Sequence, residues 1–247
     1  MNNAVAGRSA RSYYNEGRFT ALADKVVAGD YVLLYVFGFF HWRVCANLFL
    51  SEFGHNDGGS LSTTDNLRTD CYGGGTETCI SPVTGETVYT YVFYLLQAGY
   101  VSLSLLTSSN SPAFTPIRIN NPTNTPSSRL ITAKGAHLII ASPTPNNLWE
   151  TGTFSYTAPR FTGYGRSVVS SLGSLASFVD HGLYTANIYE SLGATTVDAF
   201  YPIDHTHTSP AGANTVAAAF MKGLMCGGSA LSAYSKNTTS SIAGSCA

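Results

Sequence analysis

The segment "AHLIIAS", residues 136–142, decides the fold class of this sequence. It is a β-rich apolar run that follows the turn pair Lys134-Gly135 and stops before Pro143. A short apolar run with turn residues on both sides is typical of a strand buried in a sheet. The run "YVLL", residues 31–34, follows the turn "AGD" and predicts a second buried strand.

Helical patterns accompany these strands. Apolar residues recur at helical spacing between Gly163 and Phe178, and "FVDHGLY", residues 178–184, predicts another short strand and a turn. The last helix has the clearest start, since Ser209 is a good N-cap and Pro210 fits the first helical position. Strands that alternate with helices predict an α/β sandwich around a parallel sheet.

Composition limits the classes of partner. With 247 residues the chain can build one domain with a substantial core. The net charge of −1 offers no basic surface, so neither nucleic acid nor an anionic membrane is an expected partner. The longest apolar runs, residues 31–40 and 89–96, are too short or too interrupted to cross a bilayer.

The five cysteines contain no C-x-x-C pair, which argues against a zinc or thioredoxin-like site. Cys71 and Cys79 flank one loop, and Cys226 and Cys246 bracket the tail. Each pair could close a disulfide, which implies an oxidising compartment. Cys45 would then be an unpaired thiol.

The two ends of the chain give different signals about secretion. The start, "MNNAVAGRSARS", has no apolar core, so no signal peptide is visible. Asn237-Thr238-Thr239 matches the N-glycosylation triplet, a motif short enough to arise by chance.

Two polar clusters, residues 52–59 and 203–210, follow apolar segments, as functional loops do at the carboxyl ends of parallel strands. In the second cluster Asp204 and His207 are the carboxylate and the base of a serine-hydrolase site. The alternative is a polar pair that caps the last helix. His205 and His207 could also bind a metal, but no further ligand cluster has suitable spacing, and no metal is expected.

Four stretches, in this order, resemble rhamnogalacturonan acetylesterases of the SGNH (GDSL-type) hydrolase superfamily. They are "NNAVAGRSARSYYNEGRF" (2–19), "EFGHNDGGSLSTTDN" (52–66), "TPNNLWETGTF" (144–154) and "YPIDHTHTSPAGA" (201–213). The resemblance implies a single domain over residues 1–247 with a flavodoxin-like three-layer α/β/α sandwich. It also implies an extracellular monomer that removes acetyl groups from pectic rhamnogalacturonan without a cofactor.

The resemblance also assigns roles to individual residues. His207 would be the general base and Asp204 the carboxylate that orients it. The Gly7 backbone N–H and the Asn56 amide would donate to the oxyanion, and one such donor lowers the barrier by about 3–4 kcal/mol. Cys71–Cys79 and Cys226–Cys246 match the two disulfides of the family. On simpler readings Gly7 is a left-handed turn position and Asn56 a turn residue, the role also expected of His55 and Asp57.

The sequence departs from the family at the nucleophile. It contains no Gly-Asp-Ser block and no G-x-S-x-G elbow. Met1 stands where a family chain is already past its first two strands, so the sandwich is expected to lack at least its first strand. Ser9 and Ser60 are expected to be loop residues and Ser209 a cap, so no nucleophile is found in this chain.

Two segments, residues 35–51 and about 100–129, have no counterpart in the family. Removing each one restores a continuous family pattern, so both are interpreted as translated introns in a gene model with a misplaced start codon. Cys45 lies in the first.

Three hypotheses for the whole chain follow: an acetylesterase with a Ser-His-Asp mechanism, a non-catalytic pectin-binding remnant, or a chain that does not fold stably because a central strand is missing.

Three residues are candidates for contacts with the substrate. Trp149 is either a platform for a sugar ring or a residue of loop packing. Arg8 and Arg11 could pair with galacturonate carboxylates, although surface salt bridges are the commoner fate of exposed arginine.

Overall fold

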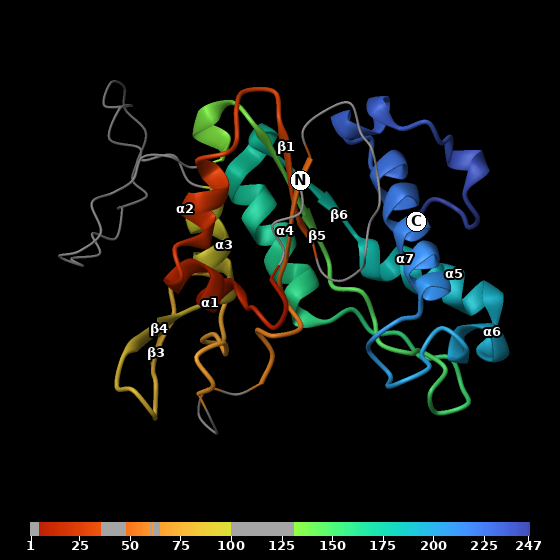
Figure 1. The fold of residues 1–247 in the computed structure, drawn as a ribbon, viewed down its shortest axis with the longest axis horizontal. Helices are drawn as coiled ribbons and strands as arrows, with labels where there is room; N and C mark the ends of the chain where they lie inside the picture. Colours follow the sequence, from red (N-terminus) through yellow and green to blue (C-terminus); the bar gives the residue numbers. More distant parts are fainter. Residues whose placement is uncertain (1–4, 36–47, 60, 62–64, 100–130) are drawn as a thin grey trace.

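The protein is an α/β sandwich in the computed structural model, which describes residues 5–35, 48–59, 61, 65–99 and 131–247 (Figure 1). Its sheet consists of parallel strands in the order β2-β1-β5-β6. Their bounds are β1 Tyr31–Tyr35, β2 Leu48–Glu52, β5 His137–Ala141 and β6 Ala176–Val179. The parallel sheet predicted from the two apolar runs is therefore confirmed.

Helices cover both faces of the sheet, with one group on each side in Figure 1. The first group is α1 Ala10–Asn15, α2 Arg18–Ala23, α3 Tyr91–Gly99 and α4 Arg160–Leu172. The second is α5 His181–Leu192, α6 Ala194–Asp198 and α7 Pro210–Cys226. Short 3-10 turns complete the chain: η2 Thr132–Lys134, η3 Gly173–Leu175, η4 Ala230–Tyr234 and η5 Thr239–Ser241.

Alternation along the strands assigns the two faces. Leu138 and Ile140 of β5 pack with α1 to α4, whereas Ile139 packs against Phe220 and Leu224 of α7. Successive side chains of a strand point to opposite faces, so a strand buried on both sides must be apolar throughout. This explains the unbroken run "HLIIA" and gives the three layers expected from the family resemblance.

Two sequence expectations need correction. The helical pattern between Gly163 and Phe178 ends at Leu172, because the chain turns at Gly173 and enters β6 at Ala176. The segment 178–184 contains the end of a strand, because Phe178 and Val179 belong to β6, but a helix rather than a turn follows it. Asp180 accepts the N–H of Leu183 and starts the twelve-residue helix α5, a cap that the apolar pattern concealed.

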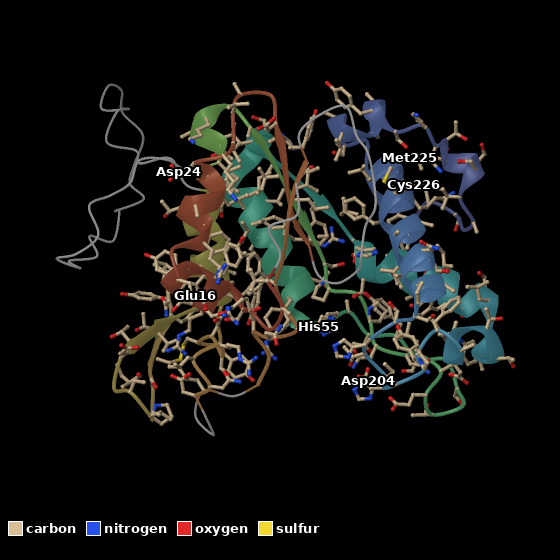
Figure 2. All side chains as sticks on the ribbon, viewed as in Figure 1. Glu16, Asp24, His55, Asp204, Met225 and Cys226 are labelled. Atoms are coloured by element: carbon tan, nitrogen blue, oxygen red, sulfur yellow. A yellow bond between two sulfur atoms is a disulfide. The ribbon has the colours of Figure 1, made fainter. Side chains whose placement is uncertain are left out.

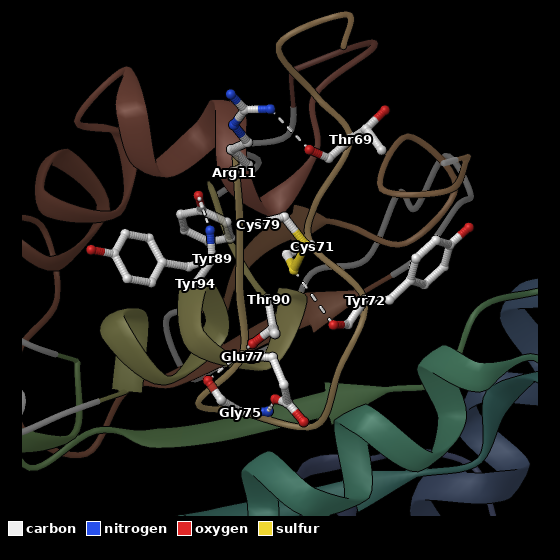
Figure 3. Close-up of a disulfide and its surroundings, with 10 residues drawn as sticks. All are labelled: Arg11, Thr69, Cys71, Tyr72, Gly75, Glu77, Cys79, Tyr89, Thr90 and Tyr94. Atoms are coloured by element: carbon white, nitrogen blue, oxygen red, sulfur yellow. Dashed lines mark hydrogen bonds between the residues drawn. A yellow bond between two sulfur atoms is a disulfide. The ribbon is translucent and has the colours of Figure 1, made fainter. Parts of the chain in front are cut away.

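Both expected disulfides are present, Cys71–Cys79 and Cys226–Cys246. The first closes the loop that leads into the antiparallel hairpin of β3 Thr78–Ile80 and β4 Thr87–Tyr89 (Figure 3). The second joins the end of α7 to the tail. Cys45 lies outside the described residues.

Both family-unlike segments lie largely outside the described residues. The part of 35–51 that is described forms strand: Tyr35 ends β1, and Leu48 begins β2. The two strands pair in parallel, with Tyr31 opposite Leu48 and Tyr35 opposite Glu52. Of the helices that the structure describes, none has the length and apolar character needed to cross a membrane.

Candidate active site

Asp204 and His207 form a hydrogen-bonded pair in the loop between α6 and α7. Oδ2 of Asp204 lies 2.7 Å from Nδ1 of His207, while Oδ1 accepts the backbone N–H groups of Thr206 and His207. The backbone and side-chain bonds from His207, followed by the bond from Thr206, lower the pKa of Asp204 to about 2. The carboxylate is thus ionised at neutral pH and directs Nε2 of the imidazole away from itself.

The pair is not the cap of the last helix. Ser209 holds that position, since its Oγ accepts the N–H of Gly212 and Pro210 occupies the first turn. Side chains of Asp204 and His207 are 42% and 62% exposed, so both can meet a ligand from solvent. The geometry favours the base-and-carboxylate prediction over the capping alternative.

Three loops meet at the carboxyl ends of the strands, where Figure 2 labels His55 and Asp204. The loop after β5 connects the other two. Nε2 of His55 lies 3.2 Å from the Thr144 carbonyl, and the Asn147 N–H donates to the His205 carbonyl at 2.8 Å. Burial lowers the pKa of His55, and repulsion from a charged His207 lowers it further, while the bond to the Thr144 carbonyl opposes the change.

The two predicted oxyanion donors are tied together by Asp57. Its buried carboxylate accepts the N–H of Ala10 through Oδ1 and the N–H of Gly54 through Oδ2, each at 2.6 Å. These bonds fix the start of α1, three residues after Gly7, against the loop that carries Asn56. Asp57 is the turn residue that was expected, since its backbone N–H donates to the Gly54 carbonyl at 3.3 Å, and its side chain in addition joins the two loops.

The backbone conformation of Gly7 and the side-chain amide of Asn56 are compatible with the predicted oxyanion contacts. Gly7 adopts φ +70°, where a Cβ would be strained, and its carbonyl accepts Nη1 of Arg68 at 3.2 Å. Within the described ranges, the half-buried Asn56 amide has no hydrogen-bond partner. An amide in that condition can donate to a ligand without breaking an existing bond.

The structure contradicts the predicted substrate contact of Arg11, whereas that of Arg8 stays a prediction. Arg11 is buried and forms a bidentate pair with Asp65, at 2.8 and 3.1 Å, and also donates to the Thr69 carbonyl. Its guanidinium cannot reach a polysaccharide. Nε of Arg8 lies 2.7 Å from Glu16, so a substrate role for Arg8 would have to exchange that partner.

Trp149 contributes to loop packing. Its indole N–H donates to the Tyr189 carbonyl at 3.0 Å, and its ring lies 5.4 Å from that of Phe154. Its edge is therefore already engaged, and a sugar-platform role remains a prediction.

The remaining site expectations concern serines and metals. Ser9 is the buried N-cap of α1, Ser209 caps α7, and Ser60 lies outside the described residues. Over the part of the chain that the structure describes, no group of three His, Cys, Asp or Glu side chains could hold a metal ion.

A parallel sheet between two helical layers, with an Asp-His pair in a loop at its carboxyl edge, defines a three-layer α/β protein and is consistent with the SGNH hydrolase fold that the resemblance implied. The crystal structure of YxiM from Bacillus subtilis shares this fold, with a TM-score of 0.54 and 15% identity over 91% of the present chain. The chain covers 44% of the YxiM chain, less than half its length. No protein-family model matches the sequence.

A relative with much higher identity defines the family. Over 232 residues, 93% of this chain and 75% of the relative, the sequence is 45% identical to a rhamnogalacturonan acetylesterase of Emericella nidulans. The chain belongs to the rhamnogalacturonan acetylesterase family, whose members are carboxylic ester hydrolases.

Proposed function

We propose that the site formed by Asp204, His207, Asn56 and Gly7 hydrolyses acetyl esters on the pectic polysaccharide rhamnogalacturonan. The observation that carries this proposal is the 2.7 Å bond between the Asp204 carboxylate and Nδ1 of His207, in a chain 45% identical to an enzyme of that name. The two disulfides support an extracellular place of action, where acetylated pectin would be met.

Each residue has one task in this reaction. Nε2 of His207 takes the proton from a serine hydroxyl as that oxygen attacks the acetyl carbonyl, and Asp204 stabilises the resulting imidazolium. The Asn56 amide and the Gly7 N–H donate to the tetrahedral oxyanion. His207 then protonates the departing sugar oxygen, so that the sugar leaves as its alcohol, and activates the water that releases acetate. We assign the serine to no residue, because the sequence has no Gly-Asp-Ser block.

Acetate release from acetylated rhamnogalacturonan tests the proposal. We expect His207→Ala to abolish release and Asp204→Asn to lower it by about 10³–10⁴-fold, as loss of the orienting carboxylate does in other triads. His205→Ala is the matched control, because this imidazole lies two residues away and pairs with Glu150 instead. Release that survives His207→Ala would refute the assignment.

The absent Gly-Asp-Ser block favours a second function, in which the chain binds pectin without turnover. In that case the wild-type chain gives no acetate but binds acetylated rhamnogalacturonan saturably in calorimetry. Acetate release that depends on His207 excludes this alternative.

A further inference from the structure

The C-terminal tail is anchored along α7. Lys222 is buried, and its Nζ donates to the carbonyls of Thr239 and Ile242 at 2.6 and 3.1 Å. Ile242 is buried against the sheet-facing core, and Cys246 is bonded to Cys226. The tail therefore has a defined position on the helix.

A hollow of about 300 Å³ lies between α7 and this tail. Its walls include Asn214, Ala218 and Met221 of the helix and Asn237, Ser241 and Ile242 of the tail. The helix side is mainly apolar, whereas the tail side presents the half-buried Asn237.

Asn237 begins the triplet Asn237-Thr238-Thr239, between η4 and η5. This is the only Asn-x-Ser/Thr triplet in the sequence in which x is not proline, since Asn121-Pro122-Thr123 is blocked by Pro122. A surface turn in a disulfide-bonded chain is where such acceptors function.

The side chain of Asn237 is available for modification, whereas the Thr238 hydroxyl lies 3.0 Å from that of Ser240. Asn237 uses its backbone N–H to reach Oγ of Ser235 at 3.0 Å, but its side-chain amide bonds to none of the residues whose positions are described. Thr239 is exposed and contributes its carbonyl, rather than its hydroxyl, to Lys222. A sugar on Asn237 would disturb neither contact.

We propose that Asn237 is an N-glycosylation site and that its first sugar covers the hollow against α7. The donor is an oligosaccharide carried on a lipid pyrophosphate. Nδ2 of Asn237 attacks C1 of the sugar, the bond from C1 to the pyrophosphate oxygen breaks, and the amide loses one proton. The lipid pyrophosphate leaves, and no atom is oxidised or reduced.

The test produces the full chain behind a secretion leader in yeast, with peptide mass spectrometry of secreted and microsomal fractions. Wild type should carry a glycan on Asn237 that PNGase F removes, leaving aspartate. Thr239→Ala should abolish the modification, while Thr238→Ala and Thr239→Ser, which keep the triplet, should retain it. Unmodified Asn237 in wild-type protein from both fractions overturns the proposal.

A second measurement tests the position of the sugar. Met221 lines the hollow, whereas Met225, one turn further along α7, does not. Removing the glycan should speed peroxide oxidation of Met221 several-fold and leave Met225 unchanged. Equal rates for Met221 before and after PNGase F would refute the covering of the hollow.

Discussion

The Asp204 carboxylate holds both the side chain and the backbone of His207. Oδ2 lies 2.7 Å from Nδ1 of the imidazole, and Oδ1 lies 2.7 Å from the backbone nitrogen of the same residue. One side chain therefore fixes the loop conformation and the ring orientation together. The geometry of this pair does not depend on burial, since both side chains are well exposed.

The Asp204–His207 pair should persist in acid. The pKa of Asp204 is lowered from 3.8 to about 2, and a carboxyl with a lowered pKa contributes stability that is lost as pH falls through its folded value. We expect the Asp204 carboxyl carbon to titrate near pH 2 by NMR. A midpoint near the ordinary value would show that the hydrogen bonds do not form in solution.

Protein stability should fall as pH rises from mildly acidic to neutral. Burial raises the pKa of Asp57 to about 6, and burial together with the nearby Asp57 charge raises that of Asp70. A raised carboxyl pKa gives stability that is present below pH 3.8 and lost as pH rises through about 6. Asp70→Asn, which removes one of the two charges, should flatten this dependence.

Thermal midpoints at pH 4 and pH 7 measure the effect of Asp70→Asn. Loss of about 1 kcal/mol shifts the midpoint by about 2–4 °C for a chain of this size. Asp24→Asn, at an exposed carboxylate, is the control and should keep the wild-type dependence. An unchanged slope in Asp70→Asn would contradict the coupling.

Two glycines of α4 should respond oppositely to alanine. A Cβ on Gly165 would lie 3.0 Å from Phe178 and 3.2 Å from Ile140, whereas one on Gly163 meets nothing within 4 Å. We expect Gly165→Ala to cost about 1–3 kcal/mol by overpacking. Gly163→Ala should gain about 0.5–1 kcal/mol from helix propensity. Urea unfolding measures both, and equal effects would show that α4 does not pack closely on the sheet.

Removing residues 35–51 should give a more stable protein, on the proposal that this segment is foreign to the fold. The deletion joins Leu34 to Glu52. In the full chain Glu52 lies opposite Tyr35, so after the deletion Glu52 would occupy the position of Tyr35 at the end of β1. The loop that carries Asn56 would follow β1 directly, about 4.8 Å closer to β5. We expect a cooperative thermal transition at a higher midpoint than that of the full chain.

Removing only residues 36–47 is the control for that deletion. It joins β1 directly to β2, and parallel strands need a crossover of about a dozen residues, so this variant cannot keep the β1–β2 pairing and should have a lower midpoint than the chain without residues 35–51. A lower midpoint after removal of residues 35–51 would show instead that β2 is part of the native sheet.

The wrong predictions, for the end of α4 and the start of α5, concern segments in which a strand pattern and a helix pattern adjoin. The helical pattern from Gly163 continued through the apolar side chains of β6, because a short buried strand and a helix cannot be separated by hydrophobicity alone. Asp180 caps α5, but its signal was masked by the preceding strand.

Three features could be predicted from the sequence alone, because each depends on residues within a few positions of one another: the strand at 137–141, the start of α7 and the Asp204–His207 pair. Two others required the tertiary structure: Asp57 joins the loops of Gly7 and Asn56, and Arg11 is buried in a pair with Asp65. Their partners Ala10 and Asp65 lie 47 and 54 residues away. Hydrophobic periodicity and helix capping depend on neighbouring residues, whereas the burial of a charged side chain depends on which distant segments the fold brings beside it.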